Sequence, residues 1–183
     1  MMKNEEVLRN KHILAVDDEP DVLEYVGEEL SMCLVDKAAD YQTALEYIQS
    51  YIYDIVILDI MGVDGFRLLE MAVRKDFPTV MLTGHAMTPE ALEKAMKLGA
   101  ACFLPKDKMT ELRRFLADVV LEGRKGAWRR LFHEFGGFFG RKFGPDWKTK
   151  HRFVQEFEEE LKMPEGRQTL RDSSSAQDNV SVQ

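Results

Sequence analysis

Five polar side chains follow short apolar runs in the first part of the chain, and together they could carry out one reaction. They are three aspartates, one threonine and one lysine: Asp17, Asp18, Asp59, Thr83 and Lys106. Clustered carboxylates repel one another and favour a cation, and oxygen donors with room left for water suit Mg²⁺. A carboxylate, a divalent cation, a lysine and a hydroxyl form a site for transferring a phosphoryl group to an aspartate.

The apolar runs before these residues are typical of buried parallel β-strands. The predicted strands are residues 12–16, 33–38, 55–58, 79–82 and 101–104. Amphipathic helical patterns separate them, so the chain contains five β–α units in succession. Right-handed crossovers then predict an α/β fold, a doubly wound five-stranded parallel sheet with helices on both faces. The ligand site of such a sheet lies at the carboxyl ends of the strands, where all five polar side chains stand.

Composition and charge divide the chain into three parts. Among its 183 residues, 45% are apolar and 31% charged, which is typical of a globular protein. Residues 1–122 hold 13 basic and 23 acidic side chains, whereas residues 123–163 hold 10 and 6. We therefore predict a first domain over 1–122 and a basic, aromatic extension over 123–163. Residues 164–183 are polar and lack apolar periodicity, which indicates a disordered tail.

Four sequence segments carry a resemblance to a known family. The runs ILAVDDEPDVLEYV, DIVILDIMGVDGF, VMLTGHA and GAACFLPKD resemble, in order, the signature segments of response-regulator receiver domains. The resemblance covers about residues 11–122 and implies the flavodoxin-like receiver fold. It implies a two-component regulator, not an enzyme, that takes a phosphoryl group from a histidine kinase or phosphotransfer protein. It further implies signalling to a downstream protein through protein–protein contacts.

The resemblance also assigns roles to individual residues. Asp59 resembles the phospho-acceptor, Lys106 the lysine that pairs with phosphate, and Thr83 the switch hydroxyl. Phe103 falls where the family carries a switching aromatic, although a core aromatic on this strand would look the same.

The metal ligands follow from the same resemblance. Asp18, Asp59 and the backbone carbonyl of Met61 would hold Mg²⁺, and Asp17 would bind it through water.

The loop after Asp59 departs from the family pattern. It reads Ile-Met-Gly-Val-Asp before Gly65, which is about two residues short and lacks the usual proline. We expect a differently shaped loop, with Gly62 supplying unusual dihedral angles. Met61 and His85 stand where the family flanks the path of attacking water, and we hypothesise that this pair sets the lifetime of the phosphoryl group.

The extension carries apolar stripes at helical spacing. The first stripe is Trp128, Leu131, Phe132, Phe135, Phe138 and Phe139, and the second is Trp147, Val154, Phe157 and Leu161. Gly123 and Gly126 interrupt the preceding helix, residues 140–145 read as a turn, and Asp146 can cap the second helix. This pattern predicts a helical hairpin that could fold on itself, on the receiver, on a second copy in a homodimer, or on a partner.

Other functions remain open alternatives. Interleaved basic and aromatic residues suit a DNA-binding output, but the extension is too short for a winged helix and shows no recognition-helix pattern, which argues against nucleic acid. An interfacial membrane helix would also fit the aromatic stripe with its arginines. An aspartyl-phosphate phosphatase of the haloacid-dehalogenase type usually needs a second aspartate where Met61 stands.

The sequence also bears on location. No apolar stretch approaches the roughly 18 residues of a membrane span, and the start of the chain lacks the apolar core of a secretory signal. We therefore expect a cytoplasmic protein without a membrane span.

Overall fold

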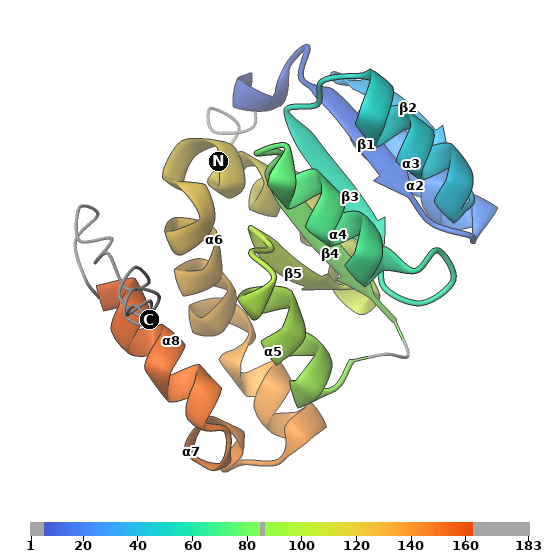
Figure 1. Cartoon of the computed structure of the whole chain (residues 1–183). Helices are drawn as coiled ribbons and strands as arrows, with labels where there is room; N and C mark the ends of the chain where they lie inside the picture. Colours follow the sequence, from blue (N-terminus) through green and yellow to red (C-terminus); the bar gives the residue numbers. More distant parts are fainter. Residues whose placement is uncertain (1–5, 85–86, 163–183) are drawn as a thin grey trace, which may run out of the picture.

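Five parallel strands form one sheet in the order β2-β1-β3-β4-β5, in a computed structural model that describes residues 6–84 and 87–162 (Figure 1). The strands are β1 (His12–Val16), β2 (Leu34–Ala38), β3 (Ile55–Asp59), β4 (Thr79–Thr83) and β5 (Cys102–Pro105). Every residue of β3, β4 and β5 is buried, as expected of strands covered on both faces. The predicted doubly wound parallel sheet is confirmed.

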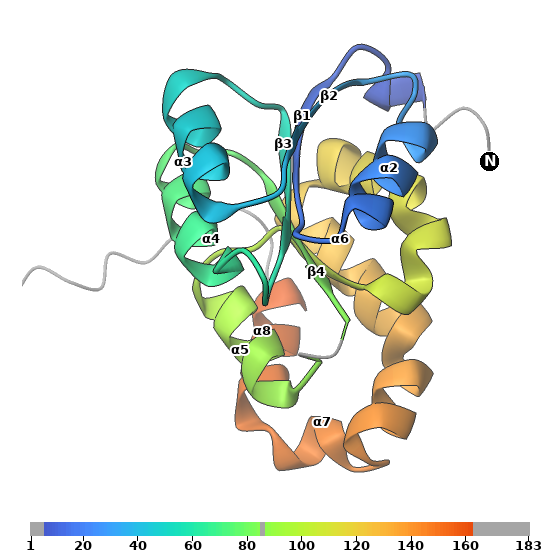
Figure 2. The same cartoon turned by 90° about the vertical axis from the view of Figure 1, so that its right-hand side faces the viewer.

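Helices cover both faces of this sheet. The elements before, between and after the strands are η1 (Glu6–Leu8), α2 (Pro20–Glu29), α3 (Tyr41–Ser50), α4 (Gly65–Arg74), α5 (Pro89–Lys97), η2 (Lys106–Glu111) and α6 (Leu112–Phe143). Figure 2 shows α2 and α6 on one face, and α3, α4 and α5 on the other. No helix in the described part of the chain is long and apolar enough to cross a membrane.

Side-chain caps begin two of these helices. The Asp40 carboxylate accepts a hydrogen bond from the backbone N–H of Thr43 (2.9 Å) at the start of α3. The Thr88 hydroxyl accepts one from the N–H of Ala91 (3.1 Å) at the start of α5. Each cap satisfies a backbone donor that has no partner within its helix.

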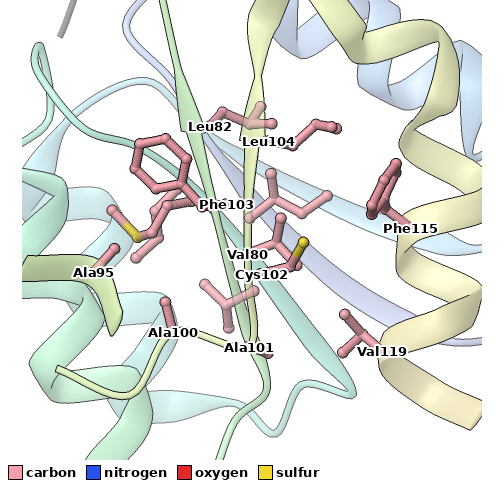
Figure 3. Packing of buried hydrophobic residues seen from close by; sticks show 14 of the residues in the cluster. Val80, Leu82, Ala95, Ala100, Ala101, Cys102, Phe103, Leu104, Phe115 and Val119 are labelled. Atoms are coloured by element: carbon pink, nitrogen blue, oxygen red, sulfur yellow. The ribbon is translucent and has the colours of Figure 1, made fainter. Parts of the chain in front are cut away.

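The core beside β5 joins the two helix layers to the sheet. Phe103 is fully buried and lies on the same side of β5 as Ala95 of α5 (Figure 3). Phe115 and Val119 of α6 lie on the opposite side. Because successive strand residues point to opposite faces, Cys102 and Leu104 flank Phe103 and point toward α6.

Helix α6 folds back on itself at Gly123. The φ and ψ angles of this residue are 65° and −169°, outside the helical region and in a combination that glycine tolerates best. Residues on either side of it then meet in antiparallel order: the rings of Phe115 and Phe135 lie 5.2 Å apart, and Arg130 pairs with the buried Asp118 at 2.9 Å. The helix therefore consists of two arms, residues 112–122 and 124–143.

The second predicted helix is divided in two. It comprises α7 (Trp147–Lys150) and α8 (Arg152–Lys162), because His151 between them adopts an extended conformation. Two details of the prediction are wrong: α6 continues to Phe143 instead of ending at the predicted turn, and the Asp146 side chain makes no capping hydrogen bond.

The extension packs on itself and on the receiver part of the chain. Helix α8 lies beside α6 (Figure 1), and the rings of Trp128 and Phe157 are 5.6 Å apart. Trp128 donates a hydrogen bond from Nε1 to the carbonyl of Ala100 (2.8 Å), and Arg124 donates to the carbonyl of Met96 (2.7 Å). These contacts join the apolar stripe to the end of α5. The division into domains at 122/123 stays a prediction, and the predicted tail lies outside the described residues.

The fold-back predicts opposite effects for two glycine-to-alanine variants. Gly123→Ala places a side chain on a backbone conformation that L-residues avoid and should lower the free energy of unfolding by about 1–3 kcal/mol. Gly136→Ala lies within the second arm, where an added Cβ meets nothing within 4 Å, and should raise it by up to about 1 kcal/mol. Urea unfolding measures both, and an equally stable Gly123→Ala variant would contradict the assigned turn.

Candidate functional site

The ends of four strands bring the predicted site residues together. Asp17 and Asp18 follow β1, Asp59 ends β3, Thr83 ends β4 and Lys106 follows β5. Carboxylate oxygens of Asp17, Asp18 and Asp59 all lie within 4.8 Å of one another. The parallel sheet therefore places the acidic cluster at one edge, as predicted.

Lys106 neutralises part of this cluster. Its Nζ lies 2.9 Å from Asp59 Oδ1 and 2.8 Å from Asp17 Oδ2. Asp17 and Asp59 are only 1% and 4% exposed, so that water screens their charges poorly. The lysine also pairs with Glu19 Oε1 at 2.7 Å, a contact that the sequence prediction missed. The only signal for it was that Glu19 directly follows the aspartate pair.

Burial and charge shift two pKa values at this edge. Burial raises the pKa of the Asp17 carboxyl, and the hydrogen bond from Lys106 opposes this effect only in part. Burial would lower the pKa of Lys106, but its hydrogen bonds to Asp17, Glu19 and Asp59 outweigh burial and raise it. The lysine therefore keeps its positive charge, and the carboxylate cluster still favours a further cation.

The short loop after β3 binds the second carboxylate oxygen of Asp59, Oδ2. The backbone N–H groups of Met61 and Gly62 donate to Asp59 Oδ2 at 2.8 and 3.2 Å. Gly62 is needed for space: a Cβ there would lie 2.0 Å from Asp18 Cγ. The expectation of unusual dihedral angles at Gly62 is wrong, because the left-handed residue of this loop is Asp64, with φ of 52°.

The two predicted switch residues are both buried. Thr83 Oγ1 is buried and has no hydrogen-bond partner within the described residues. A hydroxyl without a partner at the end of β4, the strand next to β3, suits a site that later receives an acceptor oxygen. Phe103 is buried in the core, and its part in switching stays a prediction.

Met61 lies at the mouth of the site, with 69% of its surface exposed. Its carbonyl accepts a long hydrogen bond from Asp64 N (3.4 Å), so a lone pair remains for another partner. Its role as a metal ligand, and that of Asp17 through water, stay predictions. His85 lies outside the described residues.

The residues present fit Mg²⁺. Three carboxylates at one strand edge offer oxygen donors alone, which is the donor set that this hard cation prefers. Asp18 is exposed, so solvent reaches this side of the cluster and water can complete the coordination.

Known proteins resemble this chain in sequence and in fold. Residues 13–117 match the response regulator receiver domain family. A two-component response regulator of Arabidopsis thaliana, ARR18, is 36% identical over 120 residues, covering 62% of this chain and 19% of its own length. The response regulator Rre1 of Synechocystis is 36% identical over 104 residues, covering 51% and 44%. The chain thus spans less than half the length of these two relatives.

Solved structures give the same result. The crystal structure of NtrX from Brucella abortus aligns with a TM-score of 0.55 and 31% identity, covering 63% of this chain and 28% of that one. The chemotaxis protein CheY4 of Vibrio cholerae aligns with a TM-score of 0.50 and 27% identity, covering 57% and 98%. Since the family match covers more than half of its residues, the chain belongs to the response regulator receiver domain family.

The close approach of Gly62 to Asp18 predicts a test of the metal site. Gly62→Ala should push the exposed Asp18 carboxylate away and weaken Mg²⁺ binding by roughly tenfold to a hundredfold, the usual effect of displacing a ligand's support. Gly84→Ala is the matched control, because its Cβ would lie 3.5 Å from Lys106 Cδ, an ordinary contact. Isothermal titration calorimetry measures both affinities, and equal values would exclude Asp18 as a ligand.

Proposed function

We propose that this chain is a two-component response regulator that accepts a phosphoryl group on Asp59 from a histidine kinase or phosphotransfer protein, with Mg²⁺. One observation carries the proposal: the Asp59 carboxylate is held between the Lys106 ammonium and two backbone N–H groups. The neighbouring strand β4 ends at Thr83, whose hydroxyl has no partner within the described residues. Response regulators are generally signalling proteins, and membership of their family supports this role.

The reaction needs little from the protein beyond position and charge. An oxygen of the Asp59 carboxylate forms a bond to phosphorus. The bond between phosphorus and the donor's imidazole nitrogen breaks, and its electron pair stays on that nitrogen. Lys106 offsets the arriving negative charge, and the Thr83 hydroxyl donates a hydrogen bond to a phosphoryl oxygen.

Mg²⁺ held by Asp18, Asp59 and the Met61 carbonyl, with Asp17 acting through water, would neutralise charge on the phosphoryl oxygens.

The signal would leave the site through a shift between two conformations. Thr83 and Phe103 are the proposed switch residues, and the orphaned hydroxyl supports the first of them. The output would be contact with a downstream protein through the receiver surface or the helical extension. The apolar stripe of the extension is already largely buried, which disfavours the interfacial membrane helix. DNA binding is disfavoured because the extension is too short for a winged helix and shows no recognition-helix pattern.

Several parts of this proposal rest on the sequence alone. A cytoplasmic location, a possible homodimer and the absence of enzymatic turnover are predictions. Steady-state hydrolysis of a generic phosphomonoester tests the last of them. Rapid turnover would favour the phosphatase alternative, although Met61 stands where that class has its second aspartate.

The acceptor is tested by a small phosphodonor such as acetyl phosphate with Mg²⁺. The wild-type chain should gain the mass of one phosphoryl group, and Asp59→Asn should gain none, because the amide is a poor nucleophile. Intact-mass spectrometry reads the result. An equal mass gain in both proteins would place the acceptor elsewhere, and omission of Mg²⁺ should slow the wild-type reaction.

The exposed Met61 predicts a long-lived phosphoryl group. Met61→Asn offers a hydrogen bond to an attacking water and should speed dephosphorylation by roughly fivefold, the effect of about 1 kcal/mol. Met61→Leu, which stays apolar, is the matched control and should keep the wild-type rate. Loss of the phosphorylated mass with time gives all three rates; identical rates in the three proteins would exclude this role for Met61.

A further inference from the structure

The ammonium of Lys106 is surrounded by three carboxylates, and an incoming phosphoryl group has to compete with them for its N–H donors. An ammonium has three N–H donors and no acceptor. Nζ lies within 3 Å of carboxylate oxygens of Asp17, Asp59 and Glu19, which makes three carboxylates for three donors. Its hydrogen bonds to Asp17 Oδ1 and Glu19 Oε1 are 3.1 and 2.7 Å long. A phosphoryl oxygen arriving at Asp59 therefore has to displace one of these contacts.

Exposure decides which contact is released most easily. Asp17 is 1% exposed, and removing the lysine would leave its carboxylate buried without that cation. Asp59 is the residue that receives the phosphoryl group and has to stay within reach of Nζ. The side chain of Glu19 is 64% exposed, so water can replace the lysine as its partner at little cost.

The backbone holds Glu19 in position for this contact. Its N–H donates to Asp17 Oδ1 at 3.0 Å, which ties it to the acidic cluster. Its carbonyl accepts from Val22 N and Leu23 N at 3.1 and 3.3 Å, as the residue that begins helix α2. The backbone of Glu19 is therefore fixed next to the Asp17 carboxylate, which also binds Lys106.

We propose that Glu19 is a positioning residue for Lys106. Before phosphorylation, the Glu19 carboxylate accepts a hydrogen bond from the lysine on the solvent-exposed side of the site. It competes for this N–H with the incoming phosphoryl oxygen. This inference rests on the proposed function. Glu19 acts as a built-in competitor, so its removal strengthens binding of the phosphodonor without adding any catalytic group. Such a change in ground-state binding alters the half-saturating donor concentration and leaves the maximum rate unchanged.

The test compares three variants with acetyl phosphate and saturating Mg²⁺. Glu19→Gln removes both the charge and the ion pair, whereas Glu19→Asp keeps the charge but draws the carboxylate back by one methylene. Asp21→Asn is the matched control, because Asp21 is exposed on the first turn of α2 and lines the same shallow hollow as Lys106. The initial rate of mass gain is measured against donor concentration for each protein.

Both Glu19 variants should lower the half-saturating concentration by roughly two- to fivefold, the range that an exposed ion pair allows. Asp21→Asn should match the wild type. A simple charge effect would leave the half-saturating concentration of Glu19→Asp at the wild-type value and lower that of Asp21→Asn as much as that of Glu19→Gln. This result would overturn the inference. Unchanged values in all variants would overturn it too, while leaving phosphorylation of Asp59 intact. Failure of the wild type to gain mass would overturn the proposed function itself.

Discussion

The rest of this structure depends on compensating two negative charges that are buried at the ends of neighbouring strands. Asp17 and Asp59 stand almost without solvent at the ends of β1 and β3, where their mutual repulsion opposes the sheet that creates the site. The Lys106 ammonium, brought by β5, counters this repulsion within 3 Å of both carboxylates. Because this cation follows β5, the two buried carboxylates are compensated only when the whole sheet has formed.

This balance also makes the site suited to the proposed phosphoryl transfer. The positive charge of Lys106 is secure, because three hydrogen bonds to carboxylates raise its pKa despite burial. The carboxylates still outnumber the lysine, so the cluster favours further positive charge from a metal ion. In the proposed transfer, the incoming phosphoryl group would meet an ammonium that is already beside Asp59, and only its exposed contact with Glu19 would have to be released.

The sequence predicted the sheet and the site because both depend on local patterns. Apolar runs that stop at polar residues mark the strand ends, and parallel topology then forces those ends together. The side-chain role of Glu19 could not be predicted in the same way, since it depends on the reach of Lys106 from a strand 87 residues away. The loop after β3 is predicted to be short, but the packing of Gly62 against Asp18 depends on the tertiary fold and has no signal in the sequence.

The extension also has features that its sequence pattern did not predict. Its apolar stripes predicted two helices, yet a glycine within a helical pattern does not specify the direction in which the chain continues. At Gly123 the direction is set by tertiary pairing, with Arg130 on Asp118 and Phe135 on Phe115. The split at His151 likewise interrupts a segment that reads as continuous in its periodicity.

The fold-back of α6 has a further consequence for the sheet, which ends in two edge strands. Unpaired strand edges are templates for pairing with other chains and so for aggregation. Beside β5, α6 lies along the sheet, and Trp128 and Arg124 both donate to the carbonyl of Ala100 just before that strand. At the other edge, β2 is short and carries the charged Asp36 and Lys37. The extension thus gives the β5 edge a cover of its own, and a chain without it would present an open strand next to Phe115, whose ring would lose its partner Phe135.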